Sequence, residues 1–163
     1  MAIRTGERAG ALAGVVVAPI VPAMAKTTDL ADLARADGRY EPEAFRLVAA
    51  GLQRAAERTG KAEAKDGERH LTAAELVDGI IDLAAERWSY LAGPVMRRFG
   101  LRRSRDLGEI TFVMITHQVF SKRDEDRIED FDLPQDDLDR LAQQRVGRRI
   151  EERLGMPRPA DGA

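Results

Sequence analysis

The sequence predicts an all-α fold, a compact bundle of about five helices with an amphipathic helix at its C-terminal end. Apolar residues recur at helical spacing in several separate segments. The 163 residues include five Phe, two Tyr and one Trp, so the core must be built mainly from Leu, Ile, Val and Ala, which suits helices. Hydrophobic residues make up 44% and charged residues 33% of the chain, which is typical of a single globular domain.

Residues 1–25 are expected to form a leader outside the folded domain. Residues 9–25 carry no charge, arginines precede them, and the run ends in Ala23-Met24-Ala25, which is the layout of a secretory signal peptide. The run is too short for a permanent transmembrane helix, and Pro19 and Pro22 interrupt it. The alternative is a true start at Met24. A signal peptide would export the chain, whereas this start would keep it in the cytoplasm.

The first helices are recognised by their apolar spacing and their ends. Residues 26–39 are expected to form a polar N-terminal arm with a weak helical turn or two. Pro42 suits the first position of a helix over 42–58, in which Phe45 and Leu52 lie on one face. A charged loop follows this helix.

The clearest local signal in the chain is the sequence Thr-Ala-Ala-Glu at 72–75. Thr72 and Glu75 are spaced as a capping box, in which each side chain bonds the backbone N–H of the other residue. The helix that begins there is expected to run to about residue 88. Its buried residues are expected to be Leu76, Val77, Ile80, Leu83, Ala84 and Trp88.

Two further helices are expected in the middle of the chain. One covers about 90–99, is interrupted near its start by Gly93-Pro94 and ends at Gly100. Ser104 can cap the next segment, whose β-branched and aromatic residues would also suit a strand. A helix is favoured, because the consecutive apolar residues 113–115 break strand alternation. Its stripe consists of Leu107, Ile110, Met114 and His117.

The C-terminal part combines an acidic segment with an amphipathic helix. Residues 121–137 are acid-rich, and the stretch 124–132 is expected to form a turn or short helix held by Ile128 and Phe131, because it lacks the glycine of a calcium loop. A helix over 135–154 is expected to pack its stripe on the core, with docking against another chain as the alternative. The stripe consists of Leu138, Leu141, Val146, Ile150 and Leu154. The expected divisions are a helical core domain over 40–134, this helix, and a disordered tail over 155–163.

A cluster of arginines lies between two of the expected helices: Arg97, Arg98, Arg102, Arg103 and Arg105. Such a patch could bind phosphate, an RNA backbone or an acidic partner surface. The alternative is ion pairing within the chain, because residues 124–139 are rich in carboxylates and because cations are favoured at a helix C-terminus. Pairing within the chain is the favoured interpretation.

Asp78, Asp82 and Glu86 are spaced four residues apart on the helix that begins near Thr72, and we call them the acidic ridge. Like charges at this spacing repel each other by roughly a few tenths of a kcal/mol. A divalent cation, arginines from a neighbouring helix or partner, or simple solvation would relieve the repulsion. Solvation is the favoured interpretation.

Motifs for catalysis or metal binding are not found. The chain has no cysteine, and its two histidines lack the spacing of a zinc motif. It also has no nucleophile elbow and no phosphate-binding loop. Glu109 and His117 are the polar core candidates, and His117 is expected to be buried and hydrogen-bonded. We therefore assign no catalytic residue, metal ligand or cofactor from the sequence.

Three segments resemble one protein family: RYEPEAFRLVAAGL, HLTAAELVDGIIDLA and RRFGLRRSRDLGEITFVMITHQVFSKRDEDRIEDF. The resemblance is to an uncharacterised family of small bacterial proteins, the Minf-type conserved hypothetical proteins, and covers about 39–131. It implies a compact cytosolic helical protein that begins near Met24, and it implies no activity. The chain departs from the family pattern at Phe99-Gly100, where members have tryptophan-glycine, and near Val113, where they have asparagine.

The sequence therefore favours a non-enzymatic interaction or adaptor module that contacts an unknown protein partner with its charged faces or its last helix. The first alternative is an RNA- or phosphate-binding protein that uses the arginine cluster, and the second is an enzyme that uses Glu109 and His117. A net charge of −2 argues against nucleic-acid binding through overall charge, although a local patch could still act. No integral membrane association is expected, and a cytoplasmic location is favoured over export.

Overall fold

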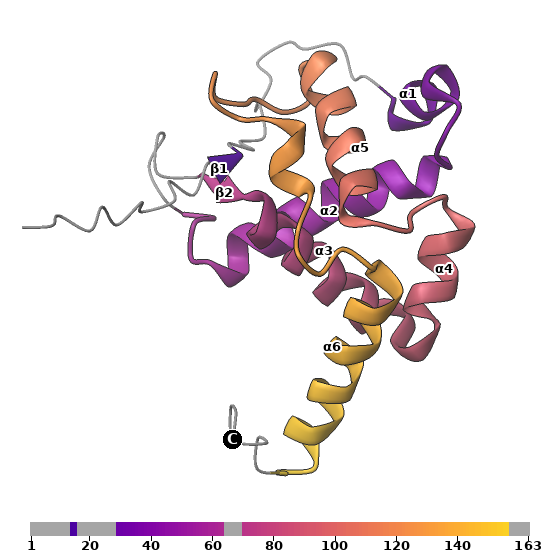
Figure 1. The fold of residues 1–163 in the computed structure, drawn as a ribbon, viewed down its shortest axis with the longest axis vertical. Coiled ribbons are helices and arrows are strands. Elements are labelled where there is room, and N and C mark those ends of the chain that lie inside the picture. Colours follow the sequence, from indigo (N-terminus) through magenta and orange to yellow (C-terminus); the bar gives the residue numbers. More distant parts are fainter. Residues whose placement is uncertain (1–13, 16–28, 64–69, 157–163) are drawn as a thin grey trace, which may run out of the picture.

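The computed structural model describes residues 14–15, 29–63 and 70–156, and this part of the chain is mainly helical (Figure 1). Its α-helices are α1 (Leu30–Asp37), α2 (Pro42–Arg58), α3 (Ala73–Trp88), α4 (Ala92–Arg98), α5 (Ser104–Thr116) and α6 (Leu138–Arg153). Short 3-10 helices are η1 (Ser89–Leu91) and η2 (Ile128–Phe131), and the two-residue strands β1 (Gly14–Val15) and β2 (Leu71–Thr72) pair antiparallel. The all-α prediction is confirmed.

The predicted leader and tail lie almost wholly outside the described residues. Of the leader, residues 1–25, the structure describes only Gly14–Val15, and of the tail only residues 155–156. None of the helices in the described ranges is long and apolar enough to cross a lipid bilayer.

The polar segment expected as an N-terminal arm contains helix α1, which packs on the domain. Leu33 and Ala34 of this helix are buried in the hydrophobic core. Asp29 caps the helix by accepting a hydrogen bond from the Ala31 N–H at 2.9 Å. The cap and these two buried side chains explain why a short polar segment forms a docked helix.

Helix α3 is central to the fold and contacts α2, α4, α5 and α6. The predicted capping box is confirmed at its start, because the Glu75 N–H donates to Thr72 Oγ1 at 3.0 Å and the Thr72 N–H donates to Glu75 Oε2 at 2.7 Å. Burial alone would raise the pKa of Glu75, but hydrogen bonds from Lys61 and Thr72 outweigh it and hold this pKa below its ordinary value. The capping carboxylate is therefore held in its charged form.

Helices α2 and α3 approach closely because glycines lie where they meet. A Cβ at Gly79 would lie 2.7 Å from backbone atoms of Ala55, and a Cβ at Gly51 would lie 2.2 Å from the Ile80 side chain. Real side chains do not make contacts this short in a packed interior. The spacing of the two helices thus requires glycine at both positions.

The segment predicted as a helix rather than a strand is α5, which confirms the helical assignment. Ser104 does not cap it as expected, because the N-cap residue is Arg103. The buried Ser104 hydroxyl instead donates to the Phe131 carbonyl at 2.6 Å. A Cβ at Gly108 would come within 2.5 Å of the Phe131 ring. These contacts hold η2 against α5, in agreement with the expected anchoring of the acidic segment by Phe131.

Helix α6 packs on the domain through buried residues that extend from its start to Val146. Leu138 and Val146 are buried, but Ile150 is 37% exposed and Leu154 is 69% exposed. The reason is that α6 packs against α3, α4 and η1, and its C-terminal end extends beyond them (Figure 1). The expectation that the whole stripe packs on the core is therefore wrong for its C-terminal part.

Candidate functional site

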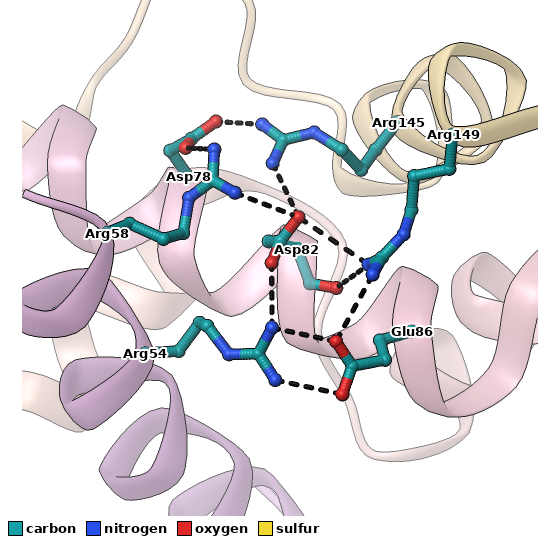
Figure 2. A network of polar contacts seen from close by, with 7 residues as sticks. All are labelled: Arg54, Arg58, Asp78, Asp82, Glu86, Arg145 and Arg149. Carbon is teal, nitrogen blue, oxygen red and sulfur yellow. Dashed lines mark hydrogen bonds and ion pairs between the residues drawn. The ribbon is translucent and has the colours of Figure 1, made fainter. Parts of the chain in front are cut away.

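The acidic ridge of α3 is surrounded by arginines (Figure 2). These arginines come from both neighbouring helices: Arg54 and Arg58 of α2, and Arg145 and Arg149 of α6. The interpretation that solvation relieves the repulsion within the ridge is wrong, and the alternative of arginines from neighbouring helices is the one observed. We call these arginines and the ridge the α3 network.

Asp82 is the buried centre of the α3 network, with a side chain only 7% exposed. Its carboxylate accepts hydrogen bonds from Arg54 at 3.0 Å and from Arg145 at 2.9 Å. Arg58 and Arg149 lie 3.2 Å and 3.6 Å from the same carboxylate. A buried carboxylate is strongly unfavourable without such partners, so these guanidinium groups offset the cost of burying it.

Glu86 extends the network towards solvent. Arg54 donates two hydrogen bonds to its carboxylate, at 2.7 and 2.9 Å, and Arg149 donates another at 3.2 Å. The bonds from Arg54 and then Arg149 lower the pKa of Glu86 from its ordinary 4.5 to about 2. This carboxylate therefore stays charged at neutral and mildly acidic pH.

Asp78 completes the network at the opposite end of the ridge. It accepts a hydrogen bond from Arg58 at 3.1 Å and pairs with Arg145. Arg145 has a side chain only 8% exposed and bridges Asp78 and Asp82. It thereby fixes the middle of α6 to α3.

The arginines of the α3 network were not among the site residues predicted from the sequence, although a signal for them exists. Residues 54 and 58 are four apart on α2, and residues 145 and 149 are four apart on α6. This is the spacing of the ridge itself, so a search for opposite charges at matching helical spacing would have identified both pairs.

A polar groove lies beside the α3 network and is lined by residues of α2, α3 and α6. The lining residues are Arg54, Arg58, Asp82, Arg145, Arg148, Arg149 and Glu152. Arg148 is exposed and forms no ion pair within the part of the chain that the structure describes. Asp78 and Glu86 pair with four of the lining arginines, so Arg148 gives the groove an excess of one positive charge that favours negatively charged ligands.

The arginine cluster identified in the sequence is largely paired within the chain, which confirms the favoured interpretation. The ion pairs are Arg97 with Asp139, Arg98 with Glu41, Arg103 with Asp136, and Arg105 with Asp132. Arg102 is exposed and has no ion pair among the described residues. These pairs connect α4 and the start of α5 to α2 and to the acidic residues before and within α6.

Glu109 and His117 do not form a buried polar site. His117 is exposed and is the C-cap residue of α5, so the expectation of a buried, hydrogen-bonded histidine is wrong. The buried face of α5 ends with Met114, because the helix stops at Thr116 and the chain turns there. The Glu109 side chain is 26% exposed and pairs with Arg39. Glu109 and His117 both line an open surface depression.

A second candidate site is apolar and lies where η1 and α6 meet. Exposed large apolar side chains in the described ranges occur on η1, on α6 and just after the end of α6, and we call them the α6–η1 surface: Tyr90, Leu91, Ile150, Leu154 and Met156. Helix α6 and η1 contact each other. Ser89, Val146 and Ile150 line a groove between them. This surface offers apolar contact area to another molecule.

No group of three or more His, Asp or Glu side chains that could hold a metal ion occurs among the residues that the structure describes. Comparison with known proteins shows that no family model, no curated protein and no solved structure matches the chain. The resemblance to an uncharacterised bacterial family therefore stays a prediction.

Proposed function

We propose that the protein is a non-enzymatic helical interaction module and that the α6–η1 surface is its docking site. The observation that supports this proposal is that η1 and the C-terminal end of α6 carry exposed large apolar side chains, and that η1 and α6 contact each other. Single exposed apolar residues are ordinary on a protein surface, but several together beside charged groups are typical of a binding site.

The proposed occupant is an apolar helix of a partner protein that carries carboxylates beside its apolar stripe. Arg153 lines the groove next to Ile150, is exposed, and forms no ion pair within the described ranges. The carboxylate of this groove, Glu86, is already paired with Arg54 and Arg149. Partner carboxylates would therefore meet a positively charged rim, while the apolar stripe of the partner covers Ile150.

The α3 network supports this proposal because it fixes the helix that carries the surface. Arg145 and Arg149 attach the middle of α6 to Asp82 and Glu86. The last turns of α6 are thus held beyond the rest of the helices (Figure 1). A preformed helix loses less conformational freedom on binding than a segment that folds on contact.

The other functions considered have less support. Nucleic-acid binding through the arginine cluster is disfavoured because Arg97, Arg98, Arg103 and Arg105 are engaged in ion pairs. An enzyme that uses Glu109 and His117 is disfavoured because the depression they line is open to solvent rather than deep.

Site-specific photo-crosslinking tests the proposal. Chains carrying p-benzoylphenylalanine in place of Leu154, the C-cap residue of α6, or of Gln144, an exposed residue within α6, are incubated with extract of cells that naturally make the protein. After irradiation, mass spectrometry identifies the crosslinked peptide. We expect position 154 to crosslink to one partner segment that is apolar and contains Asp or Glu, and position 144 to give no such product.

Several outcomes would contradict the proposal. One is a crosslink from position 154 only to a second copy of this chain. Others are equal yields of the same product at both positions, or no product at position 154.

The cytoplasmic location favoured by the sequence stays a prediction, and N-terminal sequencing of the native protein tests it. A protein that begins at Ala25 would support a start at Met24. A protein that begins at Lys26 would indicate a cleaved signal peptide.

A further inference from the structure

We propose that the polar groove beside the α3 network binds a diphosphate group, either free or as part of a larger small molecule. The groove is distinct from the α6–η1 surface, although Arg149 also lines the groove between η1 and α6. This inference therefore does not depend on the docking proposal.

The charge of the groove is the first reason. Its lining contains five arginines and two carboxylates, Asp82 and Glu152, and Asp78 and Glu86 beside it pair with four of these arginines, which leaves an excess of one positive charge. Asp82 is buried and already surrounded by guanidinium groups. Glu152 is exposed and has no ion pair in the described ranges. A dianion or higher anion would therefore experience net attraction at this site.

The hydrogen-bond donors of the arginines are the second reason. Each guanidinium carries five N–H donors in a planar fork that matches phosphate oxygens. Arg58 donates one hydrogen bond to Asp78 at 3.1 Å and pairs with Asp82 at 3.2 Å, and Arg148 makes neither contact in the described part of the chain. Donors thus remain on both sides of the groove, from α2 and from α6.

The rigidity of the groove is the third reason. Asp82 and Glu86 hold Arg54, Arg145 and Arg149 in place before any ligand arrives (Figure 2). Little side-chain entropy is then lost on binding. A ligand with a single carboxylate would have to compete with Asp82 and Glu86 for the same arginines. A diphosphate competes better, because it carries more negative charge and more acceptor oxygens.

A small molecule fits this site better than RNA does. Arg97, Arg98, Arg103 and Arg105, which would extend a basic surface, are engaged in ion pairs. The net charge of the chain is −2, so a general attraction for polyanions is lacking.

Isothermal titration calorimetry of the full chain with inorganic pyrophosphate tests the proposal at constant ionic strength, with ADP titrated in parallel. The test variant is Arg148→Gln, which removes a lining arginine without breaking an ion pair of the described residues. The control is Arg140→Gln, which removes an exposed arginine of the same helix that does not line the groove. Glu152→Gln removes the exposed competing carboxylate. Circular dichroism checks that each variant keeps its helical content.

We expect saturable binding of one pyrophosphate per chain, which Arg148→Gln weakens about tenfold through the loss of a charge-assisted hydrogen bond. Arg140→Gln should leave the affinity unchanged, and Glu152→Gln should tighten binding. Tighter binding of pyrophosphate would indicate the free ion, and tighter binding of ADP would indicate a larger ligand. Three results would overturn the proposal. The first is no saturable binding of pyrophosphate, and the second is equal weakening by Arg148→Gln and Arg140→Gln. The third is binding of single-stranded RNA that pyrophosphate does not displace.

Discussion

Arg145 of α6 and Asp82 of α3 form an ion pair of 2.9 Å in which both side chains are less than a tenth exposed. The residues are 63 positions apart in the sequence. Loss of one partner of a buried pair leaves the other charge uncompensated, so the pair couples the position of α6 to the centre of the fold. The α6–η1 surface and the polar groove both depend on this coupling, because both include residues of α6.

Replacement of Asp82 by Asn tests the buried centre of the α3 network. The substitution should lower the free energy of unfolding by about 3–5 kcal/mol, because the arginines around it lose their buried carboxylate. Asp78→Asn is the control, because the Asp78 side chain is 45% exposed. It should cost about 1 kcal/mol or less. Urea denaturation followed by circular dichroism measures both, and equal losses would contradict the assignment of Asp82 as the centre.

The low pKa of Glu86 predicts a dependence of stability on pH. The pKa is about 2 in the folded protein and 4.5 ordinarily. A depressed carboxyl pKa contributes stability that is fully present above the ordinary pKa and is lost as the pH falls towards the folded value. Melting temperatures of the wild type and of Glu86→Gln should therefore converge between pH 4.5 and about 2. A difference that stays constant over this window would show that Glu86 is not the group responsible.

A pair of glycine substitutions tests the close approach of α2 and α3. Gly79→Ala should destabilise the protein by about 1–3 kcal/mol, because the added Cβ meets the Ala55 backbone. Gly147→Ala, on α6, should stabilise it by about 0.5–1 kcal/mol, because open space surrounds that position and alanine favours a helix. Chemical denaturation measures the two changes, and effects of the same sign would count against the packing described.

The sequence was sufficient where the signals are local. The helix over 42–58 and the capping box of Thr72 and Glu75 were predicted, because a terminal proline and a cap depend on neighbouring residues alone. The exposure of His117 was not predicted. The apolar spacing of Leu107, Ile110 and Met114 continues to position 117, but α5 ends at Thr116, before that position.

The candidate sites depend on which elements meet, and periodicity within one segment carries no such information. The ridge that contains Asp82 was recognised, but its partners come from α2 and α6, which are distant in the sequence. The apolar stripe of α6 was recognised as well. The sequence did not show that Leu154 lies beyond the end of the core.

The central claim, that the α6–η1 surface is a docking site, is tested most directly by affinity for the partner segment crosslinked at position 154. The dissociation constant is measured for the wild type, Leu154→Glu and Gln144→Glu, and both variants add one negative charge to the exposed surface of the same chain. We expect Leu154→Glu to weaken binding by about tenfold or more, because burial of a leucine side chain is lost. Gln144→Glu should bind as the wild type does. Equal affinity of the wild type and Leu154→Glu would contradict the claim.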